Sequence, residues 1–276
     1  MVEKGRMAWV MDGDFDRWAM LAALEWQAEL GAVEAIGPEP VDRFESTRAE
    51  REAKAARAKA PAKGAPPPPV KAVEVDAVAV AKAAAKGAAT LEELAAVQEA
   101  FEHCDLKRGA RNFVFADGDP RARVMVIGEA PGQEEDREGT PFVGRSGQLL
   151  DRMFAAIGLS RQAPDAGAAL YITNVVPWRP PQNRDPEPGE LAMMRPFVER
   201  HIALVDPELI VLMGNPACRA LIGRAGITRL RGRWHELGER PVMPMFHPSY
   251  LLRRPENKKH AWADLLTIKA RLEGMG

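Results

Sequence analysis

The 276-residue sequence contains only two cysteines, Cys104 and Cys218, and no CxxC pair. Both a disulfide framework and a zinc site built from cysteines are therefore excluded. No apolar run approaches the roughly 18 residues that a membrane helix needs, and the N-terminal segment, which soon becomes acidic, lacks the apolar core of a signal peptide. We expect a cytoplasmic, bacterial-type protein that has no membrane partner.

Positive and negative charges are nearly balanced, and the net charge is −1. The molecule as a whole is therefore not built to attract a polyanion. Cations do gather locally, because residues 224–234 hold four arginines and no acid, and Arg253 and Arg254 follow soon after. These side chains form either one basic face or a scatter of solvated charges.

The chain divides into three parts by composition. Residues 1–36 form a predicted N-terminal helical extension, whose helix covers about 15–30 between a cap at Asp14 and a stop at Gly31. Residues 37–89 are rich in alanine, proline and lysine and read as a linker. The compact domain covers 90–276 and starts with the capping-box pattern that runs from Thr90 to Glu93.

Within 90–276, apolar stretches alternate with helical patterns. Strands are expected at 124–127, 170–176, 209–213 and 241–246. This alternation predicts an α/β fold with three α/β/α layers around a central, mainly parallel four-stranded sheet. The loops that follow the strands would then converge at one edge of the sheet.

Residues 124–150 are the most informative stretch of the sequence. A buried strand runs directly into the turn GEAPG, then into acidic or amide residues at 133–136, then into a second turn containing PFVG. Such a rigid, carboxylate-rich loop is typical of a site at the carboxyl edge of a parallel sheet. The alternative is a tight strand-to-helix connection in which the acids begin a helix.

Two further polar signals follow strands: Asn174 after YIT, and the HPS sequence that starts at His247. Together with GEAPG, PFVGRSGQLL and VPWRPPQNR, they closely resemble the family 4 uracil-DNA glycosylases, from about residue 91 to the C-terminus. The resemblance implies a DNA-repair enzyme that flips uracil out of DNA and hydrolyses its N-glycosidic bond, leaving an abasic site. It also implies a nucleoid-associated monomer whose partner is uracil-containing DNA.

The resemblance assigns roles to individual residues. Phe142 would stack on the flipped base, while Gly128 and Ala130 would line the uracil site. The amide of Asn174 would match the hydrogen-bonding edge that distinguishes uracil from cytosine. His247 would donate a hydrogen bond to O2 of the departing base, in either protonation state.

The carboxylate that handles the attacking water is left open. The best-known family of the superfamily has an aspartate at the third position of the loop motif, where this chain has Ala130. The resemblance favours Glu129 and Glu135 as replacements, with Asp136 next, and Glu134 is also available. Each of these could instead be an acid that starts a helix.

DNA contacts are expected in the segment after His247 and in the arginine-rich segment. With the family considered, a basic face is the favoured interpretation. One of two leucines would wedge into the base stack, and the remaining residues would bind phosphates. The predicted DNA-binding residues are Ser249, Leu251, Leu252, Arg253, Arg231 and Arg233.

The chain departs from the family at its iron-sulfur cysteines. Family 4 enzymes typically hold a [4Fe-4S] cluster with four cysteines, whose positions here are occupied by Phe101, Cys104, Trp178 and Met194. Because a cluster needs thiolates, we expect no cofactor and no metal. The three large side chains should instead pack around Cys104 as an apolar plug.

Two other functions compete with the enzyme. With Ala130 in the loop and the cluster gone, the domain could bind uracil-containing or abasic DNA with little or no turnover. A Rossmann-like nucleotide-binding enzyme is disfavoured because no GxGxxG follows the first strand. Covalent trapping of the abasic site is disfavoured too, since the loop at 177–188 has no histidine.

Overall fold

The computed structural model describes residues 17–29, 48 and 76–274. The chain divides into two units, Met1–Ala72 and Val73–Gly276. In the first unit, helix α1 spans Arg17–Glu29, with exposed side chains from 20 to 27. The predicted helix is thus confirmed, whereas its predicted cap and stop, Asp14 and Gly31, lie outside the described residues. No described helix is both long and apolar enough to cross a membrane.

The second unit is built on one sheet with the strand order β1-β3-β2-β4-β6-β5. Its strands are β1 Ala116–Gly118, β2 Val124–Gly128, β3 Leu170–Asn174, β4 Leu209–Met213, β5 His235–Leu237 and β6 Arg240–Met245. The four inner strands are parallel, and each edge strand pairs antiparallel with its neighbour. The α/β fold is therefore confirmed, but the sheet has six strands rather than four. Both missed strands are only three residues long, too short to show a periodic pattern.

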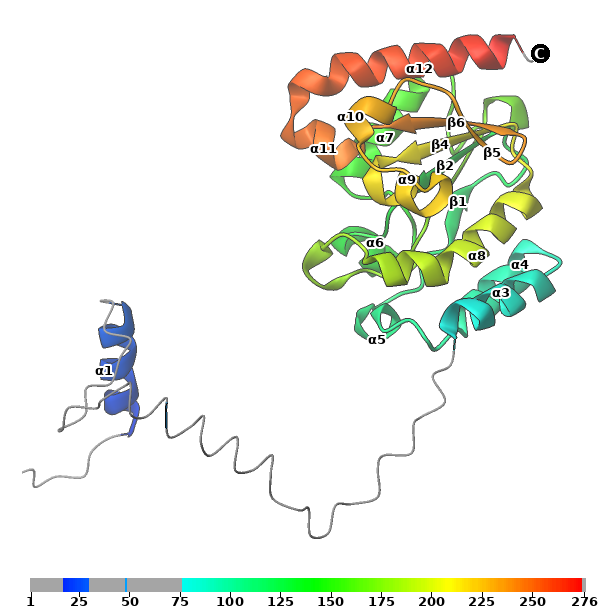
Figure 1. Cartoon of the computed structure of the whole chain (residues 1–276). Coiled ribbons are helices and arrows are strands. Elements are labelled where there is room, and N and C mark those ends of the chain that lie inside the picture. Colours follow the sequence, from blue (N-terminus) through cyan, green and yellow to red (C-terminus); the bar gives the residue numbers. More distant parts are fainter. Residues whose placement is uncertain (1–16, 30–47, 49–75, 275–276) are drawn as a thin grey trace, which may run out of the picture. The chain divides into compact units, whose positions relative to one another are not determined.

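Helices cover both faces of the sheet (Figure 1). They are α3 Ala77–Gly87, α4 Leu91–Glu99, α5 Leu106–Gly109, α6 Gln133–Glu138, α7 Arg145–Ala155, α8 Pro188–Val205, α9 Gly214–Ile222, α10 Ile227–Leu230, α11 Pro248–Arg253 and α12 Lys258–Glu273. Three short 3-10 turns complete the unit: Ala166–Ala168, Pro181–Asn183 and Pro255–Asn257. In Figure 1, α7 and α12 lie on one side of the sheet and α8 and α9 on the other.

Alternate residues of each strand point to opposite faces and so enter two separate cores. On β2, Met125 and Ile127 pack with residues of α8 and α9, while Val124 and Val126 pack with residues of α7 and α12. All four side chains are fully buried. Because both faces are covered, the inner strands read as continuous apolar runs, which explains why the sequence located them.

Helix α3 overturns part of the predicted linker. It lies within 37–89, yet it packs against α8 and buries Ala81 and Ala85. Alanine favours helices and is small enough for two helices to approach closely, so this segment packs without large apolar residues. The compact unit therefore begins before Thr90. That residue does cap α4 as predicted, accepting a hydrogen bond from Glu93 N at 3.2 Å.

The register of the sheet brings three chain segments together at its carboxyl edge. Gly128, the last residue of β2, is paired with Asn174, the last residue of β3. On the other side of β2 lie β4 and then β6, which ends two residues before His247. The three motifs of the sequence therefore meet at one edge.

Candidate active site

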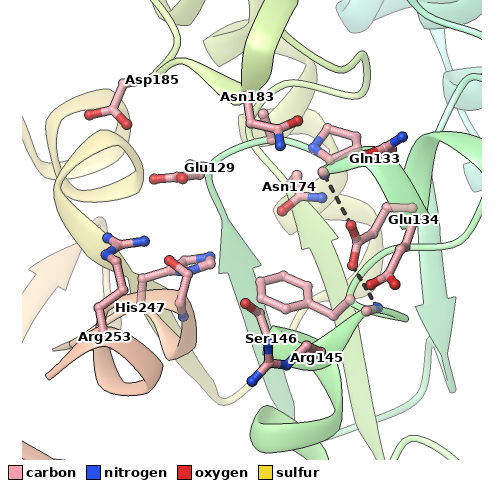
Figure 2. Close-up of a pocket in the computed structure, with 17 residues that line it drawn as sticks. Glu129, Gln133, Glu134, Arg145, Ser146, Asn174, Asn183, Asp185, His247 and Arg253 are labelled. Carbon is pink, nitrogen blue, oxygen red and sulfur yellow. Dashed lines mark hydrogen bonds between the residues drawn. The ribbon is translucent and has the colours of Figure 1, made fainter. Parts of the chain in front are cut away.

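A cavity of about 460 Å³ opens at this carboxyl edge. Figure 2 shows Glu129, Asn174 and His247 around it, with Asp185 and Arg253 on the side of Glu129. The predicted site residues that line it are Glu129, Ala130, Glu135, Phe142, Asn174, His247, Ser249 and Arg253. The remaining predicted residues are not part of its lining: Gly128, Leu251, Leu252, Arg231 and Arg233.

Gly128 allows an aromatic ring and an amide to converge on the cavity. A Cβ at this position would lie 2.3 Å from Asn174 Oδ1 and 2.6 Å from Phe142 Cζ, closer than real contacts permit. Both side chains are about 5% exposed. The ring of Phe142 also faces that of His247, with 5.5 Å between centroids. A residue with a Cβ at position 128 would therefore displace the Asn174 amide or the Phe142 ring.

Asn174 presents an unpaired acceptor in this setting. Its Oδ1 is one of two buried side-chain polar atoms in the described part of the chain that lack a hydrogen-bond partner. A buried acceptor without a partner costs about 1–3 kcal/mol. Such an atom at a cavity wall is prepared for a donor that arrives with a ligand.

His247 is a neutral histidine with one defined tautomer. Burial, together with the nearby positive charge of Arg253, lowers its pKa to about 4. Its Nδ1 accepts a hydrogen bond from Ser249 N at 3.2 Å, and Ser249 Oγ lies 2.8 Å away. Because a backbone N–H can only donate, the proton of the neutral ring resides on Nε2. His247 therefore offers one N–H donor at the cavity.

The side chain of Glu129 is not tied to a backbone amide, unlike those of Glu135 and Asp136, and it is half-buried, unlike the exposed Glu134. The pKa of Glu129 is raised from 4.5 to about 7, mainly by burial and also by the negative charge of Asp185, while Arg253 acts in the opposite direction. Its backbone carbonyl accepts a hydrogen bond from Val176 N at 3.0 Å, which fixes the loop to the segment after β3. A carboxyl group with this pKa exchanges a proton near neutral pH.

Glu135 and Asp136 are both committed to the backbone. Glu135 accepts from Gly132 N at 3.1 Å and from Gly144 N at 2.9 Å, so it bridges the two turns of the motif. Asp136 is buried and accepts from the backbone amides of residues 111 and 112 at 2.8 and 3.2 Å. Glu135 reaches the cavity wall, but both of its oxygens are engaged. Both acids therefore brace loops in this structure.

Two of the predicted DNA contacts are wrong. Leu251 is fully buried in the core between α7, α11 and α12, so it cannot wedge into a base stack. Arg231 is paired with buried Asp264, to which its Nε donates at 2.8 Å, and it also donates to His260 O. Tertiary packing turned both side chains inward, which sequence position alone does not reveal.

The remaining predicted contacts stay available. Leu252 is only partly buried. Arg233 and Arg253 are exposed, and Arg253 also lines the cavity. Ser249 is half-buried beside His247.

Several cavity residues were missed by the sequence analysis. Asn183 and Asp185 come from the proline-rich loop after β3, and Arg145 and Ser146 begin α7. A signal did exist, because loops that follow the strands of a parallel sheet build its sites. Asn183 also has a left-handed backbone with φ of 55°, a conformation that cannot be read from the sequence.

Only one of the four positions that would hold an iron-sulfur cluster has a cysteine. Phe101, Cys104, Trp178 and Met194 are all buried within a single hydrophobic core, and we call them the Cys104 cluster. Burial raises the pKa of the Cys104 thiol, so it stays protonated at neutral pH. This donor set does not fit a cluster that needs four thiolates. No group of three or more histidine, cysteine or acidic residues in the described ranges could hold a metal ion.

This domain is similar to proteins of known function. A family model described as the uracil DNA glycosylase superfamily matches residues 115–266, a range that includes every residue lining the cavity. The type-4 uracil-DNA glycosylase of Sulfurisphaera tokodaii is 38% identical over 176 residues, covering 60% of this chain and 77% of that protein. The type-4 enzyme of Thermotoga maritima is 39% identical over 160 residues, covering 56% and 79%. A type-5 uracil-DNA glycosylase of Pyrobaculum aerophilum is 33% identical over 147 residues, covering 49% and 64%.

Proposed function

The chain belongs to the uracil-DNA glycosylase superfamily, and from this premise we propose that it is a type-4 uracil-DNA glycosylase. It removes uracil from DNA by hydrolysing the N-glycosidic bond, and it leaves an abasic site. The observation that carries this proposal is the buried, unpaired Oδ1 of Asn174 beside the ring of Phe142. The pair offers what a flipped pyrimidine requires: a stacking face and a hydrogen-bonding edge.

Recognition of uracil rests on the amide of Asn174. Its Oδ1 accepts from N3–H of the base, and its Nδ2 donates to O4. Cytosine presents the opposite pattern at both atoms, so it would leave the buried amide unpaired. An unpaired buried polar group is costly, and this cost is the source of discrimination.

Departure of the base is assisted by His247. As the glycosidic bond breaks, negative charge develops on uracil, and the Nε2–H of the neutral imidazole donates to O2. The tautomer supports this role, because Ser249 N occupies Nδ1. A fixed donor in a buried site stabilises such charge more strongly than water does.

Attack by water is assigned to Glu129. The sugar acquires positive charge as the base leaves, and an ionised carboxylate stabilises it and accepts a proton from water. Glu129 is favoured over Glu135 and Asp136 because its side chain is not held by backbone amides. With a pKa of about 7, it is partly ionised at neutral pH.

The Cys104 cluster supports a second element of the proposal, that this enzyme holds no iron-sulfur cluster. Its side chains stabilise by burial the segments that cysteines would otherwise join, with Phe101 stacked edge-on against Phe197 at 5.4 Å. Iron analysis and an absorbance scan near 400 nm test this directly. A stoichiometric iron content in the purified protein would contradict it.

The proposed partner is uracil-containing DNA, bound by a monomer at the nucleoid in the cytoplasm. Arg253 and Arg233 are assigned to phosphates, and Leu252 replaces Leu251 as the wedge candidate. Ser249 has a second role here, because it also orients His247. Measured elution in size-exclusion chromatography with light scattering tests the monomeric state.

One assay decides between catalysis and mere binding. The protein is incubated with a duplex that carries a single uracil, and the DNA is then treated with hot alkali. Strand scission demonstrates excision, and a duplex with cytosine at the same position is the control. Tight binding without scission would instead identify a module that recognises uracil or abasic DNA.

A further inference from the structure

Arg161 lies outside the cavity lining, yet it reaches the loop that carries Phe142. Its side chain is only 8% exposed, which is unusual for a charged group. It sits in the turn between α7 and β3. That turn is anchored, because Leu170 N at the start of β3 donates to Ser160 O at 3.1 Å.

The guanidinium group is held by two carboxylates and directed at two consecutive carbonyls. Its Nε donates to Asp151 Oδ1 and its Nη1 to Asp117 Oδ2, both at 2.9 Å. Nη1 also donates to Pro141 O at 2.9 Å, and Nη2 donates to Phe142 O at 3.0 Å. The carboxylates neutralise the buried charge, so the remaining donors can fix the loop.

Phe142 needs such support because its backbone is left-handed, with φ of 55°. This conformation is rare for a bulky residue and persists only where the surroundings impose it. On its other side, the Phe142 carbonyl meets α7 so closely that a Cβ at Gly147 would lie 1.7 Å from its oxygen. Arg161 and α7 thus enclose this carbonyl, and the orientation of the carbonyl sets the direction of the ring.

We propose that Arg161 is a positioning residue, which holds Phe142 in the conformation that makes its ring the stacking face for the flipped base. This inference rests on the proposed function. It gives Arg161 a role in base binding beyond fold stability. If Arg161 only stabilised the fold, its substitution would cause the same loss whether or not the ring of Phe142 is present.

The test is a double-mutant cycle with Arg161→Gln, Phe142→Ala and the double variant. The value of kcat/KM is measured on uracil-containing DNA. The dissociation constant for free uracil is measured by calorimetry. Arg161→Gln should lower kcat/KM about 10- to 100-fold and weaken uracil binding in parallel. On the Phe142→Ala background it should add little further loss, because the ring through which it acts is gone.

Arg123→Gln is the matched control. Arg123 also joins distant segments, donating to Glu208 at 2.8 Å and to Leu272 O at 3.3 Å, but it lies away from the cavity. It should alter thermal stability without altering uracil binding. Asp117→Asn provides a milder perturbation of the same guanidinium if Arg161→Gln folds poorly. It should show the same dependence on Phe142.

Losses that add fully in the double variant, or unchanged uracil binding in Arg161→Gln, would overturn the proposal. The calorimetric arm separates it from the proposed function. A wild-type protein that binds uracil without excising it would contradict glycosylase activity, while the binding cycle would still decide the role of Arg161. A wild-type protein that neither excises nor binds uracil would overturn both, whereas one that excises uracil but binds the free base weakly would leave the kcat/KM cycle to decide the role of Arg161.

Discussion

The cavity wall and the Cys104 cluster both contain buried side chains, but these differ in whether their polar atoms have hydrogen-bond partners. At the cavity, Asn174 keeps an acceptor without a partner and Phe142 is held in a left-handed conformation. In the Cys104 cluster, aromatic and sulfur-containing side chains pack within a core and no charge is present. Trp178 is the fourth residue after Asn174, so one short segment contributes to both regions.

Burial alone does not mark a functional residue. His201 and His247 are both desolvated, and burial lowers their pKa values to about 3 and about 4. His201 is paired with the hydroxyl of Tyr171 at 2.8 Å and stacks on Phe115. His247 keeps Nε2 for a ligand. The unused hydrogen-bonding capacity, rather than the shift in pKa, separates the two roles.

The largest expected effect is at Asn174, whose buried acceptor has no partner. Asn174→Ala removes two hydrogen bonds to uracil and should lower kcat/KM about 100- to 1,000-fold. Thermal stability should stay unchanged or rise slightly, because an unpaired acceptor is removed. The measurements are single-turnover excision and a melting curve.

Thr173 supplies the matched control for that change. It is also buried, but its Oγ1 donates to Phe115 O, so its hydrogen bond is already made. Thr173→Ala should lower the melting temperature and leave excision nearly intact. A loss of stability in Asn174→Ala as large as that of Thr173→Ala would show that the Asn174 amide stabilises the fold, and it would contradict the binding role.

A change in the Cys104 cluster should have the opposite signature. Met194 is fully buried, and Met194→Ala should destabilise the fold by about 2–5 kcal/mol. Urea unfolding measures this change, and the excision rate of the folded protein at 25 °C should stay within about twofold because the cavity is untouched. Met193, the half-buried neighbour, gives the control, since Met193→Ala should cost much less. Excision that collapses in Met194→Ala before the fold does would contradict the structural role.

A smaller effect is expected in the pH dependence of excision. Since Glu129 acts ionised and its pKa is about 7, the rate should fall as the pH drops through 7. Asp185 raises this pKa and Arg253 lowers it. Asp185→Asn should therefore move the acid limb to lower pH, and Arg253→Gln should move it to higher pH. A limb that stays in place in both variants would remove Glu129 from the mechanism.

Stability should follow the opposite trend over the same range. The pKa of Glu129 rises from 4.5 to about 7 on folding, so the folded protein binds this proton more tightly than the unfolded chain does. The contribution of Glu129 to stability is therefore lost as the pH increases through this window. In Glu129→Gln, urea unfolding between pH 5 and pH 8 should show a weaker decline than in the wild type.

The smallest expected effect is at Arg233, which follows α10 and is compared with its neighbour Arg231. Arg233→Ala should weaken DNA binding a few-fold and reduce the salt dependence by about one phosphate contact. Arg231→Ala should instead destabilise the fold, because it leaves buried Asp264 without its ion pair. Fluorescence anisotropy at several salt concentrations and urea unfolding distinguish these outcomes. An equal loss of DNA affinity in both variants would contradict the assignment.

Much of the fold could be predicted, because its causes are local. The inner strands are apolar on both faces, and Thr90 caps α4 through its own side chain. Helix α3 was not predicted because its alanine-rich sequence resembles a linker, and its packing against α8 is not visible in the sequence. The short edge strands were not predicted either, since their pairing with β3 and β6 defines them.

The residue types at the ends of the strands could be read from the sequence, and they pointed to the family and to the candidates Glu129, Phe142, Asn174 and His247. Which of their atoms remain free depends on the folded structure. Glu135 accepts hydrogen bonds from two backbone amides, Leu251 is buried in the core, and Arg231 forms an ion pair with Asp264. The physical reason is that a motif specifies chemical groups, whereas hydrogen bonding and burial depend on neighbours that are distant in the chain.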